Sequence, residues 1–403
     1  MKKWVEIALG IMTSIGGFLD VGTLATAAQA GASFGFALLW TLPLGTLCVI
    51  FLMEMSGRLA AVSRHPLRAA IHERFGFSFS TWLLAVEFVL NLLVLAAEVG
   101  GVCVGLQLAT GIGVRVWAIP VASVLLLFLW FGSFGFIEQS VSFLGLITLA
   151  FVAAAWRLHP EAGTLAQGLI PRWPQHNAAQ YWFIAVSILG SLITPYLLHF
   201  YSSGAIEDKW DESYLGINRV VSTLGMAFGS VISAAVLVVA AMVLAPAGIR
   251  VDSYEQAALM MVPVIPHGFG LFVGSLLIAC FGAAAEVALA QAFVAAQTFG
   301  WNYSKNLHAS NSSRFTFVYA ACIFVAPVLL LAGADPLKLT LFSMALTATC
   351  LPLIAVPFLI VMNDEHFVGE HGNGFASNGV VLFVITLAFV LGVVSIPLES
   401  FGS

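Results

Sequence analysis

Eleven stretches of mostly apolar residues constrain this chain more than any other feature of its sequence. A helix that crosses a bilayer needs about 20 such residues, and each stretch is about that long or longer. The predicted spans cover residues 5–31, 36–62, 81–110, 115–133, 138–157, 180–206, 218–246, 267–297, 314–333, 338–362 and 379–397. They leave no room for a separate soluble domain. The sequence therefore predicts one all-α polytopic membrane domain over residues 1–403.

The composition excludes several function classes. Only 9% of the residues are charged, against about 25% in an ordinary globular domain. This is too little polar surface for a soluble enzyme, a nucleic-acid-binding protein or a disordered chain. The five cysteines stand alone in apolar runs, without metal-ligand or redox spacing. No nucleophile–base pattern or cofactor loop appears, so we expect neither catalysis nor a cofactor.

Lys and Arg residues in the short loops indicate the orientation of the chain. With the N-terminus in the cytoplasm, ten basic residues lie inside (Lys2, Lys3, Arg58, Arg64, Arg68, Arg74, Lys209, Arg219, Lys305 and Arg314) and five lie outside (Arg115, Arg157, Arg172, Arg250 and Lys338). We expect a multi-pass protein of the cell (inner) membrane with an extracytoplasmic C-terminus. The polar stretch 363–378, with two histidines and three acidic residues, is interpreted as a solvated cytoplasmic loop because no metal-ligand spacing organises it.

Two spans carry the signals of an interrupted helix. Irregular backbone is tolerated in a membrane only where it is buried in protein or lines a cavity. In the first span, glycines flank Asp20 within residues 16–23, and Thr23 is predicted to cap a second half-helix that starts near residue 24. In the sixth span, Thr194 and Pro195 have the residue types of a helix cap and a first helical position.

The two breaks lie five spans apart, and an odd number of spans inverts the second half of the chain in the membrane. Residues 5–157 and 180–362 are thus predicted to form two inverted repeats, with 379–397 as an additional helix. Matching breaks in inverted repeats indicate the central binding site of a transporter. The alternative interpretation is a pair of ordinary glycine or proline kinks.

Three carboxylates lie deep within predicted spans: Asp20 in the first break, Glu98 in the third span and Glu286 in the eighth. A carboxylate at the bilayer centre costs at least about 2.5 kcal/mol, so such residues are functional candidates. Glu54 and Glu87 lie nearer to span ends, where we expect them to meet headgroups or basic neighbours.

Oxygen ligands gather at the two breaks. Asp20 offers a carboxylate, Thr23 and Thr194 offer hydroxyls, and the unwound backbone near Gly17 and Ser191 offers carbonyls. Such an all-oxygen site suits Mg²⁺, Ca²⁺ or Mn²⁺. An Na⁺ ion with an organic substrate beside it fits the same residue types.

Residues 20–32 resemble the first-helix signature of the Nramp divalent-metal transporters, which reads Asp-Pro-Gly-Asn before a similar Ala-Gly-Ala. Residues 97–100, 190–202 and 282–301 resemble the third, sixth and eighth helices of that family. The resemblance extends from about residue 5 to residue 397. It implies a LeuT-like 5+5 inverted repeat with an eleventh helix, and transport by alternating access.

In that family the metal is bound by the Asp and Asn of the first helix, the Met of the sixth helix and nearby backbone carbonyls. The resemblance places Asp20 at the Asp position, Thr23 at the Asn position and Thr194 at the Met position. Gly17 and Ser191 fall at the carbonyl positions. The sulfur that favours transition metals in the family is absent from its usual place, as in the magnesium-transporting branch.

The family's proton route also differs here. Leu95 stands at an acidic position, Tyr196 and Tyr201 replace histidines, and Met344 stands near a glutamine position. We therefore expect weak or absent proton coupling. The substitute proton-path candidates are Glu98, Glu286 and His199. For His199, a relay role and a simple hydrogen bond to a neighbouring helix both remain open.

We expect a secondary transporter that imports a hard divalent cation, Mg²⁺ or Mn²⁺ first, and no enzyme activity. The metal ion is the substrate, the lipid bilayer is the other partner, and neither a nucleic acid nor an obligate protein partner is expected. The alternative is a transporter of the same fold that couples an organic substrate, such as an amino acid, to Na⁺ or H⁺. A non-transporting sensor would need a partner surface that the sequence does not show.

Overall fold

The computed structural model describes residues 20–174, 176–304 and 311–401, and its regular elements over this range are α-helices and short 3₁₀ turns. The elements are α2 (Val21–Phe34), α3 (Thr41–Ser63), α4 (Leu67–Thr110), α5 (Val114–Phe131), α6 (Phe134–Gly145), η1 (Leu146–Thr148), α7 (Leu149–Leu158), α8 (Ala162–Gly168), α9 (Ala178–Leu192), α10 (Pro195–Glu207), η2 (Glu212–Tyr214), α11 (Leu215–Val243), α12 (Tyr254–Ala258), η3 (Leu259–Met261), α13 (Gly268–Phe299), α14 (Ser313–Val325), α15 (Val328–Leu331), α16 (Pro336–Val361), α17 (Glu365–Val368), η4 (Gly369–His371) and α18 (Phe375–Phe401).

Nine helical segments of the described chain are long and apolar enough to cross a membrane, and they match nine of the eleven predicted spans. The first predicted span lies partly outside the described residues, and Gly17 belongs to the part that is not described. The fifth, predicted as one helix over 138–157, is instead divided into α6, η1 and α7, because the backbone tightens into a 3₁₀ turn after Gly145. This single-helix prediction was wrong.

Helix α4 extends farther than its apolar stretch. It starts at Leu67, before the predicted span, and the backbone leaves helical geometry at Gly76, where φ is 82°. Only glycine adopts this left-handed region readily. The charged segment before Gly76 was missed because hydropathy reports only the part of a helix that meets lipid.

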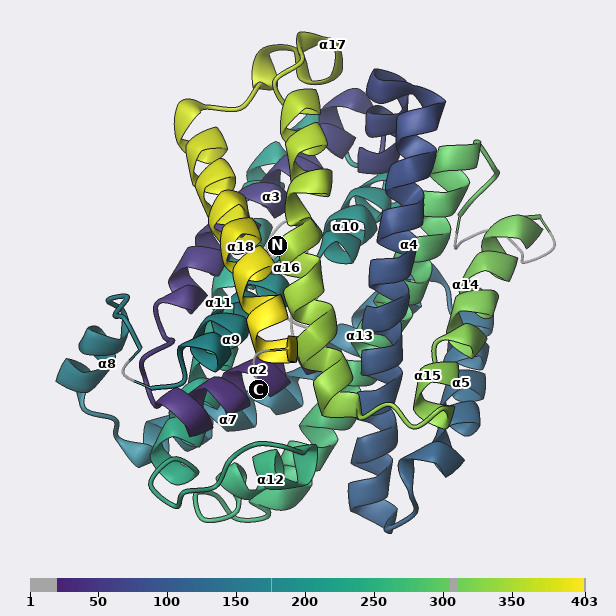
Figure 1. Ribbon diagram of the computed structural model, residues 1–403. Helices are drawn as coiled ribbons and strands as arrows, with labels where there is room; N and C mark the ends of the chain where they lie inside the picture. Colours follow the sequence, from purple (N-terminus) through teal and green to yellow (C-terminus); the bar gives the residue numbers. More distant parts are fainter. Residues whose placement is uncertain (1–19, 175, 305–310, 402–403) are drawn as a thin grey trace.

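The described parts of the two spans that were predicted to be interrupted lie in the interior of the bundle. Helix α2 packs against α9, α11 and α16, while α4 packs along α13 and α16 (Figure 1). Every residue from Val21 to Ala32 of α2 is buried, and so is the end of α9 from Tyr181 to Leu192, with the exception of the partly exposed Trp182. The candidate site residues of the two breaks are therefore enclosed by protein.

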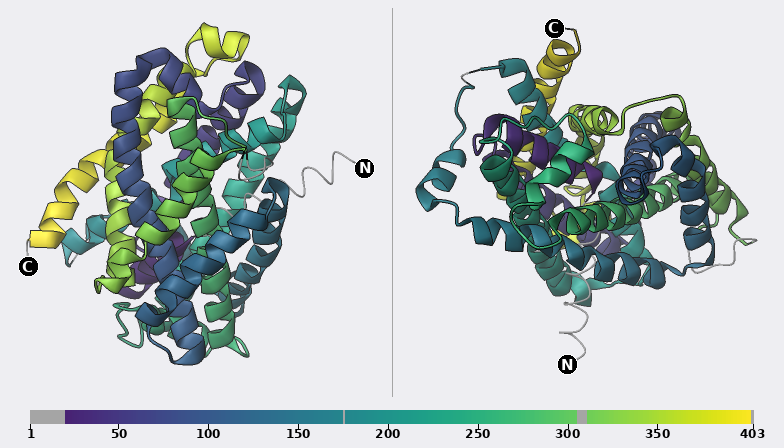
Figure 2. Two further views of the ribbon diagram at one scale, coloured as in Figure 1. Left: turned by 90° about the vertical axis from the view of Figure 1, so that its right-hand side faces the viewer. Right: turned by 90° about the horizontal axis from the view of Figure 1, so that it is seen from below.

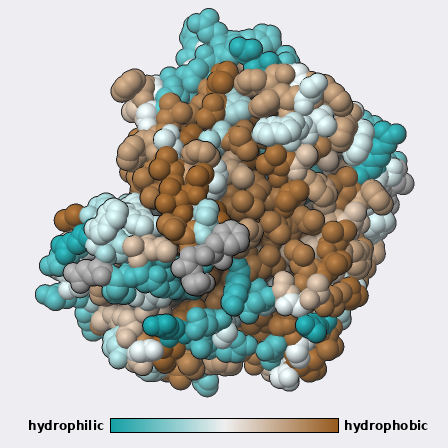
Figure 3. Space-filling model, in the orientation of Figure 1, coloured by the Kyte–Doolittle hydropathy of each residue, from teal (hydrophilic) through white to brown (hydrophobic). Residues whose placement is uncertain are grey.

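Outward-facing apolar side chains cover the middle of the molecule. Helix α18, yellow in Figure 2, lies at the edge of the bundle. Its Phe383 is 60% exposed, and Phe131 at the end of α5 is 80% exposed. In the view of Figure 3, an apolar band separates polar surface near α17 from polar surface around α8 and α12. This arrangement is that of a multi-pass membrane protein, whose middle faces lipid and whose ends face water.

Loops expected on one side of the membrane meet at one end of the bundle. Arg74 pairs with Asp364 at 2.8 Å, which joins the start of α4 to the loop before α18. Arg58 pairs with Glu54 at 3.1 Å and also donates to the carbonyl of His371. Glu54 thus has the basic neighbour that its position near a span end predicted.

Candidate functional site

After the first predicted break, the described chain begins with a capping box. Asp20 Oδ1 accepts hydrogen bonds from the Thr23 N–H (2.7 Å) and the Thr23 hydroxyl (2.8 Å), and Thr23 Oγ1 accepts one from the Asp20 N–H (3.1 Å). Asp20 is therefore the cap and α2 begins at Val21. The prediction that Thr23 caps a helix near residue 24 was wrong. The carboxylate satisfies the Thr23 N–H itself, so the helix starts three residues earlier.

The second break is set by proline. Helix α9 ends at Leu192, Ile193 and Thr194 have non-helical backbone angles, and α10 begins with Pro195, as the sequence predicted. Because Pro195 has no N–H, the carbonyl of Ser191 loses its i+4 donor. No backbone hydrogen bond to this carbonyl is formed within the described residues. Thr194 is the cap by backbone position, although its side chain makes no capping bond.

Glu98 brings a second carboxylate to the start of α2. Its two oxygens lie 3.2 and 3.3 Å from the backbone nitrogen of Val21, and the Cys280 thiol is hydrogen-bonded to the same carboxylate. The N-terminus of a helix carries a partial positive charge that stabilises both acids. Within the described part of the chain, neither Asp20 nor Glu98 forms an ion pair with a lysine, arginine or histidine.

Tyr196 connects the two breaks. Its hydroxyl donates to Asp20 Oδ2 at 3.4 Å and is also hydrogen-bonded to the Thr194 side chain. The sequence placed Tyr196 at a family histidine position but did not anticipate this contact. Ser191 lies alongside α2 one turn farther on, where its hydroxyl is 3.4 Å from that of Thr26.

We define the α2 cluster as Asp20, Thr23, Glu98, Thr194 and Tyr196. None of its members is more than 3% exposed, so the structure shows the cluster closed to solvent. Glu286 on α13 is 3% exposed and lies close enough to interact electrostatically with both Glu98 and Tyr196. The structure thus brings Asp20, Thr23 and Thr194 together with two of the three proton-path candidates, whereas Gly17 lies outside the described residues.

His199 belongs to a different group, the Glu87 cluster, which consists of Arg68, Glu87 and His199. Glu87 Oε1 lies 3.0 Å from His199 Nε2, and Glu87 Oε2 lies 3.2 Å from Arg68 Nη1. All three side chains are at most 1% exposed. Glu87 thus has the basic neighbour that the sequence predicted. It precedes Glu98 by eleven residues on α4, about 16 Å at 1.5 Å per residue, so His199 is not next to the other candidates.

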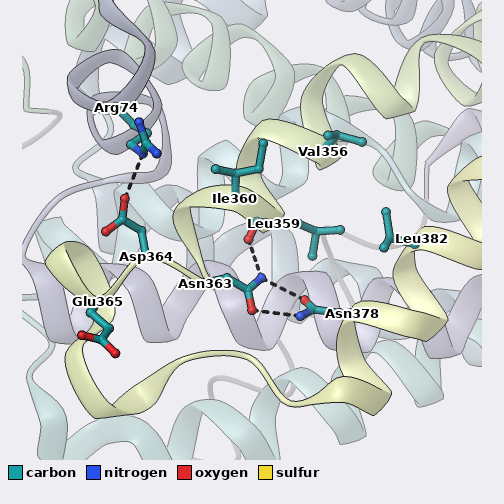
Figure 4. Close-up of a pocket in the computed structure, with 9 residues that line it drawn as sticks. All are labelled: Arg74, Val356, Leu359, Ile360, Asn363, Asp364, Glu365, Asn378 and Leu382. Carbon is teal, nitrogen blue, oxygen red and sulfur yellow. Dashed lines mark hydrogen bonds and ion pairs between the residues drawn. The ribbon is translucent and has the colours of Figure 1, made fainter.

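A pocket of about 740 Å³ lies elsewhere, between the C-terminal end of α16, the start of α18 and the start of α4 (Figure 4). Four of its five polar lining residues bond one another. Arg74 faces Asp364, and Asn363 and Asn378 exchange hydrogen bonds of 2.9 and 3.2 Å. None of the residues that line this pocket belongs to the α2 cluster, so the two are distinct.

Comparison with known proteins gives consistent results. The family described as "Natural resistance-associated macrophage protein-like" matches residues 10–397. A divalent metal cation transporter MntH of Listeria innocua is 25% identical over 413 residues, which cover 97% of this chain and 90% of that protein. MntH proteins of Brucella suis and Xylella fastidiosa are 26% and 28% identical over 66% of this chain. These two matches span 60% and 59% of the relatives' own lengths.

Solved structures show the same fold. A crystal structure of the Eremococcus coleocola manganese transporter in complex with an aromatic bis-isothiourea compound superposes with a TM-score of 0.76 at 18% identity, covering 97% of this chain and 85% of that one. Mhp1, a nucleobase-cation-symport-1 family transporter in a closed conformation, gives 0.61 at 14% identity, over 98% and 92% of the two chains. The architecture is therefore the LeuT-like 5+5 inverted repeat with an eleventh helix.

Proposed function

The chain belongs to the Nramp family, and we propose that it is a secondary transporter that imports a divalent metal cation, Mn²⁺ or Mg²⁺, by alternating access. One observation supports this proposal above all. Two buried carboxylates, Asp20 and Glu98, meet at the start of α2, and within the described residues neither is ion-paired. Two uncompensated charges are expensive inside a membrane protein, and a bound divalent cation neutralises both.

The donors around Asp20 suit such an ion. Its carboxylate supplies the formal counter-charge, and Thr23 and Thr194 supply hydroxyl oxygens. The carbonyl of Ser191, freed by Pro195, supplies a further ligand, and we assign the Gly17 carbonyl to the same shell although it lies outside the described residues. Oxygen ligands of this kind, completed by water, bind Mg²⁺ and Mn²⁺. Relatives carrying the name divalent metal cation transporter support the same cargo.

Alternating access requires that the closed site opens to each side in turn. We propose that helix α10 moves during this change, because its Tyr196 contacts Asp20 and its His199 contacts Glu87. We propose that the N-terminus is cytoplasmic and the C-terminus extracytoplasmic, from the excess of Lys and Arg in the loops on that side. The ion then moves from the C-terminal side to the N-terminal side.

We further propose that transport is not tightly coupled to protons. Leu95 cannot titrate, and Tyr201 donates its hydroxyl to Asn218 at 2.8 Å. Glu98 and Glu286 lie beside the site, but His199 is bonded to Glu87, which precedes Glu98 by eleven residues on α4. We therefore propose that the three candidates do not form one continuous proton path.

Substitution of Asp20 by asparagine tests the cargo. Asparagine caps helices as well as aspartate does, so Asp20→Asn removes the charge and keeps the start of α2. We expect saturable binding of Mn²⁺ or Mg²⁺ to the purified protein by isothermal titration, and its loss in the variant. Asp335→Asn is the matched control, because Asp335 caps α16 by accepting from the Lys338 N–H at 2.9 Å, away from the site.

Full metal binding in Asp20→Asn would overturn the site. If the wild type gives no heat with any of these metals but binds an amino acid more tightly when Na⁺ is present, the organic-substrate alternative is favoured instead. Uptake into vesicles, with acidification of the lumen as a second readout, tests the coupling proposal. Metal-dependent acidification in proportion to uptake would contradict it.

A further inference from the structure

A buried thioether on another helix lies close to the start of α2. Met344 on α16 is fully buried, and its thioether lies against Gly22 in the first turn of α2. A Cβ built on Gly22 would be 2.7 Å from Met344 Sδ and 2.5 Å from its Cε. The thioether therefore occupies the space that any larger residue at position 22 would need. Gly22 is only two residues after Asp20.

The backbone of Met344 is fixed at the other break. A Cβ on Gly190, the residue before Ser191, would overlap the carbonyl oxygen of Met344. Helix α16 thus approaches the last turn of α9 as closely as glycine allows. The Met344 side chain starts at the end of α9 and reaches the start of α2, and so bridges the two breaks whose oxygens form the proposed site.

From this placement, and on the basis of the proposed transport function, we propose that the Met344 thioether is a ligand of the transported cation and makes the site prefer Mn²⁺ and Cd²⁺ to Mg²⁺. Methionine has three rotatable side-chain bonds, so Sδ moves toward an ion without displacing α16. Sulfur ligands bind transition metals and Cd²⁺ better than Mg²⁺, which requires oxygen. The site is then a mixed oxygen–sulfur site.

A second sulfur atom lies nearby but is already engaged. The Cys280 thiol is hydrogen-bonded to Glu98, on the side of α2 where α4 and α13 pack. A Cβ on Gly101 would meet both Cys280 Sγ and the side chain of Val21. Met344 approaches from α16, so the two sulfur atoms are distinguished by substitution.

The test uses the purified full chain loaded with Cd²⁺, observed by X-ray absorption at the cadmium edge. We expect a sulfur neighbour in the wild type that disappears in Met344→Leu, a substitution that preserves apolar volume. We also expect Cd²⁺ affinity to fall about tenfold while Mg²⁺ affinity is unchanged. Met226→Leu is the matched control, because Met226 is equally buried but lies on α11.

The outcomes separate this inference from the proposed function. Cd²⁺ that binds in an Asp20-dependent manner with only oxygen neighbours would overturn the role of Met344 and leave the cation site in place. A sulfur neighbour that persists in Met344→Leu would identify a different sulfur and overturn it too. Wild-type protein that binds neither Cd²⁺ nor Mn²⁺ would overturn both. The wild-type spectrum by itself shows whether the bound Cd²⁺ has a sulfur neighbour, even where a variant fails to fold.

Discussion

The α2 cluster and the Glu87 cluster are both buried, both contain a carboxylate of α4, and both contact α10. They differ in charge balance. Glu87 has Arg68 and His199 within 3.2 Å, whereas Asp20 and Glu98 are held only by neutral groups and the start of a helix within the described residues. The first arrangement is complete without a ligand and the second gains most from a cation. Burial of a charge alone therefore does not distinguish the two clusters, and the missing counter-charge is why we propose the α2 cluster as the cation site.

The largest effect on stability should come from a substitution in the Glu87 cluster. Arg68→Ala removes the arginine partner of Glu87 and also the bonds from Arg68 to the Ser80 carbonyl (2.5 Å) and to Thr298 (2.9 Å). Removal of one member of a buried ion pair costs about 3–5 kcal/mol of unfolding free energy. Chemical unfolding of the protein in detergent should show this loss.

Arg74→Ala is the control for that experiment. Arg74 pairs with Asp364, but its side chain is 47% exposed, so this pair contributes at most about 1 kcal/mol. Equal losses in the two variants would show that the Glu87 cluster is not the stabilising element proposed here.

The two glutamates of α4 should separate stability from metal binding. Glu98→Gln still accepts a hydrogen bond from the Val21 N–H through its amide oxygen, so the protein should fold, with metal affinity lowered about tenfold. Glu87→Gln leaves Arg68 buried and unneutralised, so the protein should unfold more readily but keep its metal affinity. Titration and thermal unfolding of both variants measure the two effects. If folded Glu87→Gln loses as much metal affinity as Glu98→Gln, the clusters are not independent.

The smallest effect concerns selectivity. Thr194→Met adds a thioether at the start of α10, and we expect Cd²⁺ to gain a few-fold over Mg²⁺ in competition for uptake. Thr194→Leu, of similar size but without sulfur, should show no gain. A matching gain in both variants would mean that residue 194 acts through packing and does not touch the ion. Combining Thr194→Met with Met344→Leu should recover part of the Cd²⁺ preference.

Much of the candidate site follows from local sequence. Asp20 within a glycine-rich break and Pro195 after Thr194 mark the interruptions, because a proline without an N–H and a carboxylate in an apolar span both have few structural explanations. The expectation that Glu54 and Glu87 find basic neighbours is confirmed by Arg58 and Arg68. The exact start of α2 was missed because Asp20 and Thr23 both have the residue type of a helix cap, and the sequence does not show which of them is the cap.

Other features depend on which helices become neighbours. Nothing in the sequence near Val21 indicates that Glu98, 77 residues away, accepts its N–H. Nor does the sequence show that His199 pairs with Glu87 and not with Glu98. Gly22 and Gly190 indicate in the sequence that another helix packs closely there, because small residues occur where membrane helices approach each other. They do not indicate that the neighbouring residue is Met344.

The sequence by itself determined the number and order of most spans, the break before Pro195 and the buried acid Asp20, because apolar length, proline and buried charge act locally along the chain. The tertiary structure decided which buried acids have a counter-charge, and it decided that the Met344 thioether lies against the first turn of α2. Those outcomes depend on distances of a few ångströms between helices far apart in the chain. Such distances are set by the packing of the whole bundle.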